Sequence, residues 1–191
     1  EFIEYALNKQ ITIKKEVPVV IISRYATLFD GDSGPGSKNI ASAPNKYLSV
    51  PYSSFSKEIF GEMRNGIINT ACEFAKTRTV YMMRPIPDPI YNVPTTMGRA
   101  LLLENQYDRI SITLEEYQKR NAFLLETQDM AAERCGVKLL DPLPYLCSDG
   151  RCWGDVDGLP IYYDDDHMNE RGGALLIPLF RQIFESNIAL R

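Results

Sequence analysis

This 191-residue sequence is poor in long hydrophobic runs, and it has neither an initiator methionine nor a signal peptide. Its longest apolar stretches, residues 18–22 and 174–180, are far shorter than the roughly 20 residues that span a bilayer. The chain opens within the apolar pattern of Phe2, Ile3, Ala6 and Leu7, as a piece cut from a longer protein would. We therefore expect a soluble fragment that has no transmembrane segment of its own.

Basic clusters and histidine are also scarce. Lys and Arg total 21 against 25 Asp and Glu, and no Lys/Arg block occurs, which argues against a nucleic acid or an anionic membrane as partner.

The single histidine, His167, excludes a polyhistidine metal site. Residues 155–158 fail the calcium-loop pattern because Leu159 and Pro160 stand where a ligand and the turn glycine are needed. We therefore expect no metal and no cofactor.

Only four cysteines are present, Cys72, Cys135, Cys147 and Cys152. The last two flank a turn-forming Asp-Gly pair, so a disulfide can close this small loop in an oxidising compartment. Zinc is the alternative, although it favours C-x2-C pairs or histidines. Cys72 and Cys135 each lie late in a predicted helix, where the sequence is equally compatible with free buried thiols and with a second disulfide.

What the sequence does contain is an alternation of β-type and helical segments. Apolar and β-branched runs predict strands at residues 18–23, 79–83 and 137–140, with a further extended piece at 161–163. Amphipathic spacing predicts helices at residues 1–10, from Ser54 or Ser56 to about 76, at 97–104, from Thr113 to Gly136 and at 170–184. Thr113 and Glu116 have the spacing of a capping box, and prolines between residues 85 and 94 argue against regular structure there. The alternation predicts one α/β domain with a parallel sheet, whose site lies at the carboxyl ends of the strands.

The only histidine has a carboxylate partner at a useful distance along the chain. Asp164 precedes His167 by three residues, and at a turn or a helix start such positions share one face. The Asp164 carboxylate could therefore accept a proton from the imidazole and fix its tautomer, as general-base catalysis requires. The alternative is a solvated acidic loop in which the histidine has no chemical role.

Several segments of the chain, taken in order, resemble one family. Residues 140–147, Cys152 and residues 159–174 resemble the end of the SGNH hydrolase-like domain fused to acyltransferase-3 membrane proteins. In that family the last block reads roughly Tyr-x-Asp-x-x-His-Leu-Ser and is followed by Gly-Ala. Residues 19–25 look like the family's third strand, and residues 79–87 look like its fourth strand and the loop after it.

The resemblance implies a flavodoxin-like (SGNH-type) parallel sheet with helices on both faces. Residues 1–191 would be the C-terminal portion of a single SGNH-like domain, from the helix before the third strand to the last helix. The first strand, the nucleophilic serine and the second strand would precede residue 1, in a segment of roughly 60–80 residues. Strand 18–23 would then have an open apolar edge, so this fragment should aggregate or need a partner.

The resemblance also implies an activity. It is that of an extracytoplasmic O-acetyltransferase on the periplasmic face of a bacterial inner membrane, acting on a surface polysaccharide such as lipopolysaccharide O-antigen. A fused or associated membrane domain would deliver the acyl donor, and a glycan would be the acceptor. His167 would be the general base and Asp164 its orienting partner. Asp165 and Asp166 have the wrong offset from the histidine and are expected to be surface carboxylates or loop-fixing acceptors.

Two family features have no match in this sequence. Gly31-Asp32-Ser33 has the letters of the family's nucleophile block, but it neither follows a strand directly nor opens a helix, so we interpret Ser33 as a loop serine. Ser23-Arg24-Tyr25 stands in place of the Gly-x-Asn-Asp oxyanion block of the wider SGNH group. Arg24 could assist catalysis or anchor a loop, and the sequence slightly favours the anchor.

Two other functions stay open at the level of sequence. An esterase or deacetylase would use the same residues with water as the acceptor. A non-catalytic carbohydrate-binding or docking domain would stack sugars on aromatic side chains, for which Trp153, Tyr162 and Tyr163 are candidates. The competing interpretation of these three aromatics is that they are half-buried packing residues.

Overall fold

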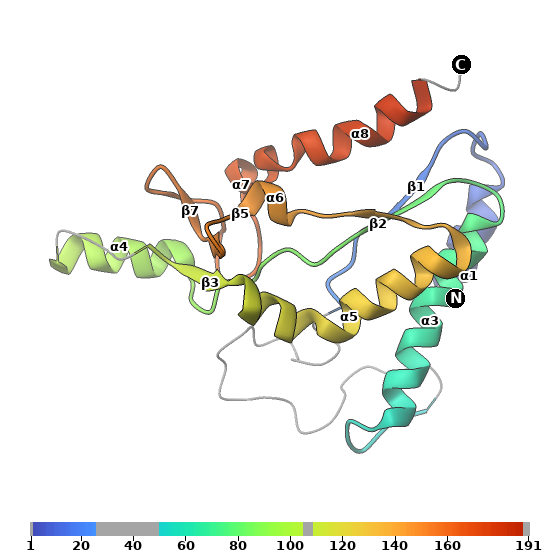
Figure 1. Cartoon of the computed structure of the whole chain (residues 1–191), viewed down its shortest axis with the longest axis horizontal. Coiled ribbons are helices and arrows are strands. Elements are labelled where there is room, and N and C mark those ends of the chain that lie inside the picture. The colour runs from blue at the N-terminus through green and yellow to red at the C-terminus, as the bar shows by residue number, and fades with distance from the viewer. Residues whose placement is uncertain (1, 26–49, 105–108, 189–191) are drawn as a thin grey trace.

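The computed structural model of the chain describes residues 2–25, 50–104 and 109–188 (Figure 1). Its central sheet is parallel and contains β1 (Val19–Ile21), β2 (Val80–Met83) and β4 (Lys138–Leu140), in that order. All four residues of β2 are buried, as expected for a strand covered on both faces. The predicted α/β fold and its three parallel strands are confirmed.

Helices cover both faces of this sheet. Side chains of β2 alternate between them: Val80 and Met82 belong to one apolar cluster, Tyr81 and Met83 to another. The first cluster joins the sheet to α1 (Phe2–Gln10), α3 (Lys57–Ala75) and α5 (Leu114–Cys135), and the second joins it to α8 (Ile177–Ile188). Figure 1 shows α8 on one side of the strands and α3 and α5 on the other.

Sequence signals fix the ends of the long helices. The Thr113 side chain accepts a hydrogen bond from the Glu116 backbone N–H, and the Glu116 carboxylate accepts one from the Thr113 N–H, so the predicted capping box opens α5. Gly136 ends α5 with a φ of 71°, a conformation that glycine adopts without a steric penalty. Ser56 is the N-cap residue of α3, one of the two positions predicted.

Proline changes two of the predicted helices. Helix α4 (Val93–Glu104) begins four residues earlier than predicted, because Pro94 lies in its first turn, where the missing N–H is no loss. The predicted final helix is divided into α7 (Glu170–Leu175) and α8, since Pro178 cannot donate the hydrogen bond that a continuous helix needs.

Short antiparallel strands were not predicted. β3 (Ser111–Thr113), β5 (Cys147–Ser148) and β6 (Arg151–Trp153) form one small sheet, and β7 (Asp155–Val156) pairs with β8 (Leu159–Pro160). Helix α6 (Leu143–Leu146) leads into β5. Both hairpins turn at an Asp-Gly pair with positive φ, Asp149-Gly150 and Asp157-Gly158. Strands of two or three residues carry no readable alternation, which is why the sequence did not reveal them.

All four cysteines form disulfides. Cys147–Cys152 closes the β5–β6 hairpin, as predicted. Cys72–Cys135 joins α3 to α5 across 63 residues and settles the question that the sequence left open. No free thiol is left for zinc, and two structural disulfides are typical of an oxidising compartment.

One edge of the central sheet is open within the described part of the chain. β1 has a strand neighbour on one side only among the described residues, and Val20 and Ile22 are 38% and 62% exposed. Within the same residues, no helix combines the length and the apolar character that crossing a membrane requires. Gly31-Asp32-Ser33 lies outside the described residues.

Candidate active site

His167 lies on a tight loop between β8 and α7. An isolated β-bridge between Tyr162 and Met168 closes the loop, and the backbone N–H of Tyr163 donates to the His167 carbonyl at 2.7 Å. The Asn169 side-chain amide donates to the Pro160 carbonyl at 2.8 Å. Backbone hydrogen bonds and the Asn169 side chain therefore hold the loop, so that the imidazole has a fixed starting point.

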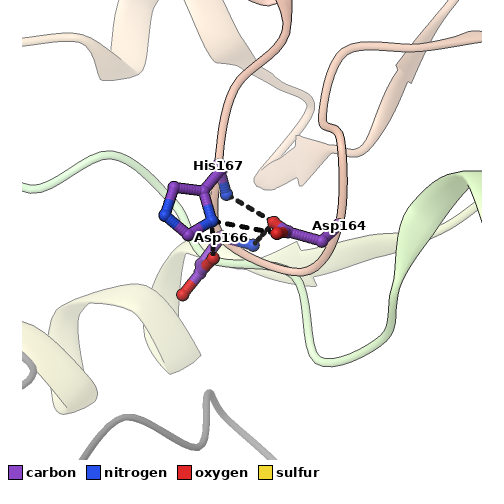
Figure 2. Close-up of side chains that lie close together, drawn as sticks. All are labelled: Asp164, Asp166 and His167. Atoms are coloured by element: carbon purple, nitrogen blue, oxygen red, sulfur yellow. Dashed lines mark hydrogen bonds and ion pairs between the residues drawn. The ribbon is translucent and has the colours of Figure 1, made fainter.

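The Asp164 carboxylate shapes this loop and also holds the imidazole (Figure 2). Its Oδ1 atom accepts hydrogen bonds from the backbone N–H groups of Asp166, at 3.0 Å, and of His167, at 2.7 Å. Its Oδ2 atom lies 2.9 Å from His167 Nδ1. The structure thus brings together the two residues that the sequence paired, through a turn in which the carboxylate replaces a backbone acceptor.

Asp166 is a second partner of the same imidazole nitrogen. Its Oδ1 atom lies 2.6 Å from His167 Nδ1, and the residue is only 8% exposed. It also forms an ion pair with Arg24, which follows β1. The expectation that Asp166 is a surface carboxylate is therefore wrong, whereas its contacts with Arg24 and the imidazole agree with the alternative of a loop-fixing acceptor. No hydrogen bond or ion pair links Asp165 to any described residue.

Behind Asp166 the charged residues continue into the protein. Asp88 is 8% exposed and lies 4.0 Å from Arg24 Nη2 and 3.2 Å from Arg120 Nη2. Arg24 therefore lies between two buried carboxylates, so its charge is neutralised from both sides. These contacts give Arg24 an anchoring role between β1 and the histidine loop.

The carboxylates set the protonation of the imidazole. The Asp164 hydrogen bond, followed by the charges of Asp166 and Asp164, raises the pKa of His167 above 6.5. Burial raises the pKa of Asp164, but the N–H groups of Asp166 and His167 outweigh burial and lower that pKa to about 2. Burial raises the pKa of Asp166, and the Arg24 charge opposes that rise. The loop therefore presents an ionised Asp164 to an imidazole that is a stronger base than usual.

The other ring nitrogen is available for chemistry. Figure 2 shows that the contacts with both carboxylates are made by Nδ1, and that Nε2 lies on the side of the ring away from Asp164. Among the described residues, none donates a hydrogen bond to Nε2, and the His167 side chain is 69% exposed. A cavity of about 330 Å³ adjoins it, lined in part by Ser23, Arg24, Tyr25, Ile86 and Met168. An imidazole held at Nδ1 and open at Nε2 is the arrangement of a general base.

Asp164, Asp166 and His167 also form the one group in the described part of the chain whose ligand atoms could approach a metal ion, all within 4.8 Å of one another. Arg24 already neutralises Asp166, and His167 Nδ1 already occupies an oxygen of each carboxylate. This arrangement favours the acid–base role, and we assign no metal.

The three aromatics proposed for sugar stacking have different environments. Tyr162 is 1% exposed and donates its hydroxyl to the Pro87 carbonyl at 2.6 Å, so the packing interpretation is right for this residue. Tyr163 is 63% exposed. Trp153 is half-buried, and the Arg109 guanidinium lies 3.9 Å from the centre of its ring.

Residues that the sequence did not single out also support the site. Asp88 and Arg120 had no local signal, because their contacts join elements that are distant in the chain. Gly172, in α7, packs so closely that an added Cβ would lie 2.3 Å from the Ile161 carbonyl oxygen and 2.7 Å from Met168 Cε. The loop that carries His167 thus lies directly against a backbone position that only glycine can occupy.

We expect Gly172→Ala to lower the free energy of unfolding by about 3 kcal/mol, because the Cβ meets a backbone atom that cannot move aside cheaply. The matched control is Gly173→Ala in the same helix, where nothing lies within 4 Å and alanine favours the helix. Urea unfolding of both variants measures the difference. Equal stability of the two variants would contradict the close packing of the loop on α7.

Comparison with known proteins gives one family match. The model of a family described as the SGNH domain fused to AT3 domains matches residues 4–182. No curated protein matches the chain. Among solved structures, the periplasmic domain of a lipopolysaccharide acetyltransferase from Salmonella ser. Paratyphi A has 16% sequence identity and a TM-score of 0.48. That alignment covers 69% of this chain and 50% of the solved one.

Proposed function

The chain belongs to the family of SGNH domains fused to AT3 domains, and from this membership we propose that it is the extracytoplasmic domain of an O-acyltransferase. It transfers an acetyl group to a sugar hydroxyl of a bacterial surface polysaccharide, such as lipopolysaccharide O-antigen. A fused or associated membrane domain delivers the acyl donor. The two disulfides support a periplasmic location, since thiols stay reduced in the cytoplasm.

The observation that carries this proposal is the orientation of His167. Asp164 and Asp166 hold Nδ1, at 2.9 and 2.6 Å, and leave Nε2 facing solvent beside the cavity. With the proton on Nδ1, the Nε2 lone pair is free to accept a proton from a hydroxyl group. The ionised Asp164 carboxylate then stabilises the imidazolium that forms.

In the first half of the reaction, a serine Oγ attacks the carbonyl carbon of the acyl donor. The serine proton moves to His167 Nε2, and the imidazolium returns it to the leaving group of the donor. The acetyl group is then held as an ester on the serine. We expect this serine in the block that the family pattern places ahead of the third strand, since Ser33 is interpreted as a loop serine.

In the second half, the sugar hydroxyl attacks the acyl-serine. His167 Nε2 accepts the hydroxyl proton as the new ester bond forms, and it gives the proton back to the departing serine Oγ. Asp164 acts as a positioning residue in both halves, since it touches the imidazole and not the reacting atoms. Asp166 has the same geometry and, through Arg24, ties the imidazole to the end of β1.

One observation favours a second candidate, an esterase or deacetylase. The His167 side chain is 69% exposed, so water can reach Nε2 as easily as a sugar hydroxyl can. A hydrolase would use the same residues and release free acetate.

Product analysis separates the two activities. Purified full-length protein receives 4-nitrophenyl acetate as donor and the de-O-acetylated surface polysaccharide of the producing bacterium as acceptor. We expect acetylated polysaccharide, identified by NMR, and little free acetate beyond the reaction without protein. Free acetate alone would support the esterase, and neither product above that background would overturn an enzymatic role.

A further inference from the structure

A second cavity, of about 550 Å³, lies between the two small hairpins and helix α6, and its volume is typical of ligand sites. It shares no lining residue with the cavity beside His167. We name it the hairpin groove and define it by five of its lining residues. They are Arg109, Tyr145, Ser148, Trp153 and Asp157.

The walls of the hairpin groove are rigid. The Cys147–Cys152 disulfide clamps the β5–β6 hairpin, and both hairpins turn through Asp-Gly pairs whose positive φ suits a tight turn. The Trp153 indole N–H donates to Ser148 Oγ at 3.0 Å, which fixes the plane of the ring. A site built in this way loses little conformational entropy when a ligand binds.

Arg109 is fixed in the groove while part of its guanidinium stays available. Its Nε donates to Oδ1 of Asp155 at 3.0 Å, and its Nη2 donates to the Asp155 carbonyl at 2.9 Å. Asp155 is 1% exposed, so this pair is anchored in the protein interior. Nη1 makes no hydrogen bond to any described residue and lies on a side chain that is 46% exposed.

These groups together select the chemistry of a ligand. The charges of Arg109 and Asp155 cancel, and Asp157 adds a negative charge, so the groove disfavours phosphate or another strong anion. Tyr145 lines the groove and is 37% exposed, and an aromatic ring is a surface on which apolar C–H groups can pack. Ser148, Asp157 and Arg109 Nη1 offer hydrogen-bond donors and acceptors around it. An aromatic face surrounded by such groups suits a neutral, hydroxyl-rich molecule.

We propose that the hairpin groove binds a saccharide segment of the acceptor polysaccharide, apart from the hydroxyl that reacts at His167. This assignment rests on the proposed function for its substrate class. The two cavities adjoin the two ends of one loop, because Ile161 lines the groove, His167 lines the other cavity, and the Asn169 N–H bonds to the Ile161 carbonyl. A polymer in the groove would therefore have to span this one loop for another of its sugars to reach Nε2.

Binding can be measured on the full-length protein, so that the test does not depend on the stability of an isolated fragment. Titration with the de-O-acetylated surface polysaccharide of the producing bacterium, followed by isothermal calorimetry, should give saturable binding. Tyr145→Ala should weaken this binding about tenfold. Tyr163→Ala, which removes an exposed aromatic outside the groove, and His167→Ala should leave it unchanged, and circular dichroism confirms that each variant is folded.

Absence of saturable binding, or equal weakening by Tyr145→Ala and Tyr163→Ala, would overturn the groove as a saccharide site. The outcomes also separate this assignment from the proposed function. Saturable binding without any transfer of acetyl would retain the groove and reject the acyltransferase. Transfer to the polysaccharide with equal efficiency in Tyr145→Ala and the unaltered protein would reject the groove alone.

Discussion

Replacing His167 with alanine in the full-length protein will lower acetyl transfer to the polysaccharide by about 10³-fold or more, because the change removes the general base. The chain has no second histidine that could take over. The acetyl content of the polysaccharide, measured by NMR in cells that produce only the variant, reports the loss.

The fold should tolerate this change. The His167 side chain is 69% exposed, so its removal leaves no cavity in the core. Unfolding in urea and circular dichroism provide the control for structure. Acetylation at the level of the unaltered protein would reject His167 as the base and would leave Asp164 and Asp166 as carboxylates that merely shape a loop.

The three consecutive aspartates of the loop provide a matched test of position. Asp164→Asn should lower the rate of transfer by about 10²- to 10⁴-fold, because the amide no longer fixes the proton on Nδ1 or stabilises the imidazolium. Asp165→Asn should change nothing, because Asp165 makes no ion pair or hydrogen bond within the described part of the chain. Equal losses in the two variants would reject Asp164 as the positioning residue.

The pH profile of the rate separates a positioning role from a structural one. The base works only when neutral, and Asp164 raises the pKa of His167, so the rate should fall with decreasing pH through a midpoint above 6.5. Asp164→Asn removes the hydrogen bond that stabilises the protonated ring, which should move this midpoint to lower pH. A variant that was merely less stable would lose rate at every pH and keep the midpoint.

Local signals in the sequence were sufficient for much of this site. The apolar run of β2, the capping box at Thr113 and the three-residue spacing of Asp164 and His167 each depend on neighbours in the chain. Such signals predict an element or a contact without knowledge of the whole fold. The pair Asp164–His167 could therefore be named before the structure was known.

The remaining features depend on contacts between distant segments. Asp166 precedes the histidine directly, an offset that differs from the family's, and its buried partner Arg24 comes from the distant segment that follows β1. The bond between Cys72 and Cys135 likewise depends on how α3 packs on α5. Neither contact has a periodic signature, so neither could be predicted from spacing alone.

The pairing of the cysteines has a consequence for biogenesis. Cys72 bonds to Cys135 and Cys147 to Cys152, so the partners follow one another in chain order. A thiol oxidase that joins cysteines as they emerge from a translocation channel would produce both native bonds directly. The hairpin bond forms from the last two cysteines, five residues apart, after the bond between the helices has used the first two. Among the four cysteines of residues 1–191, oxidation in chain order would therefore give both native bonds without later isomerisation.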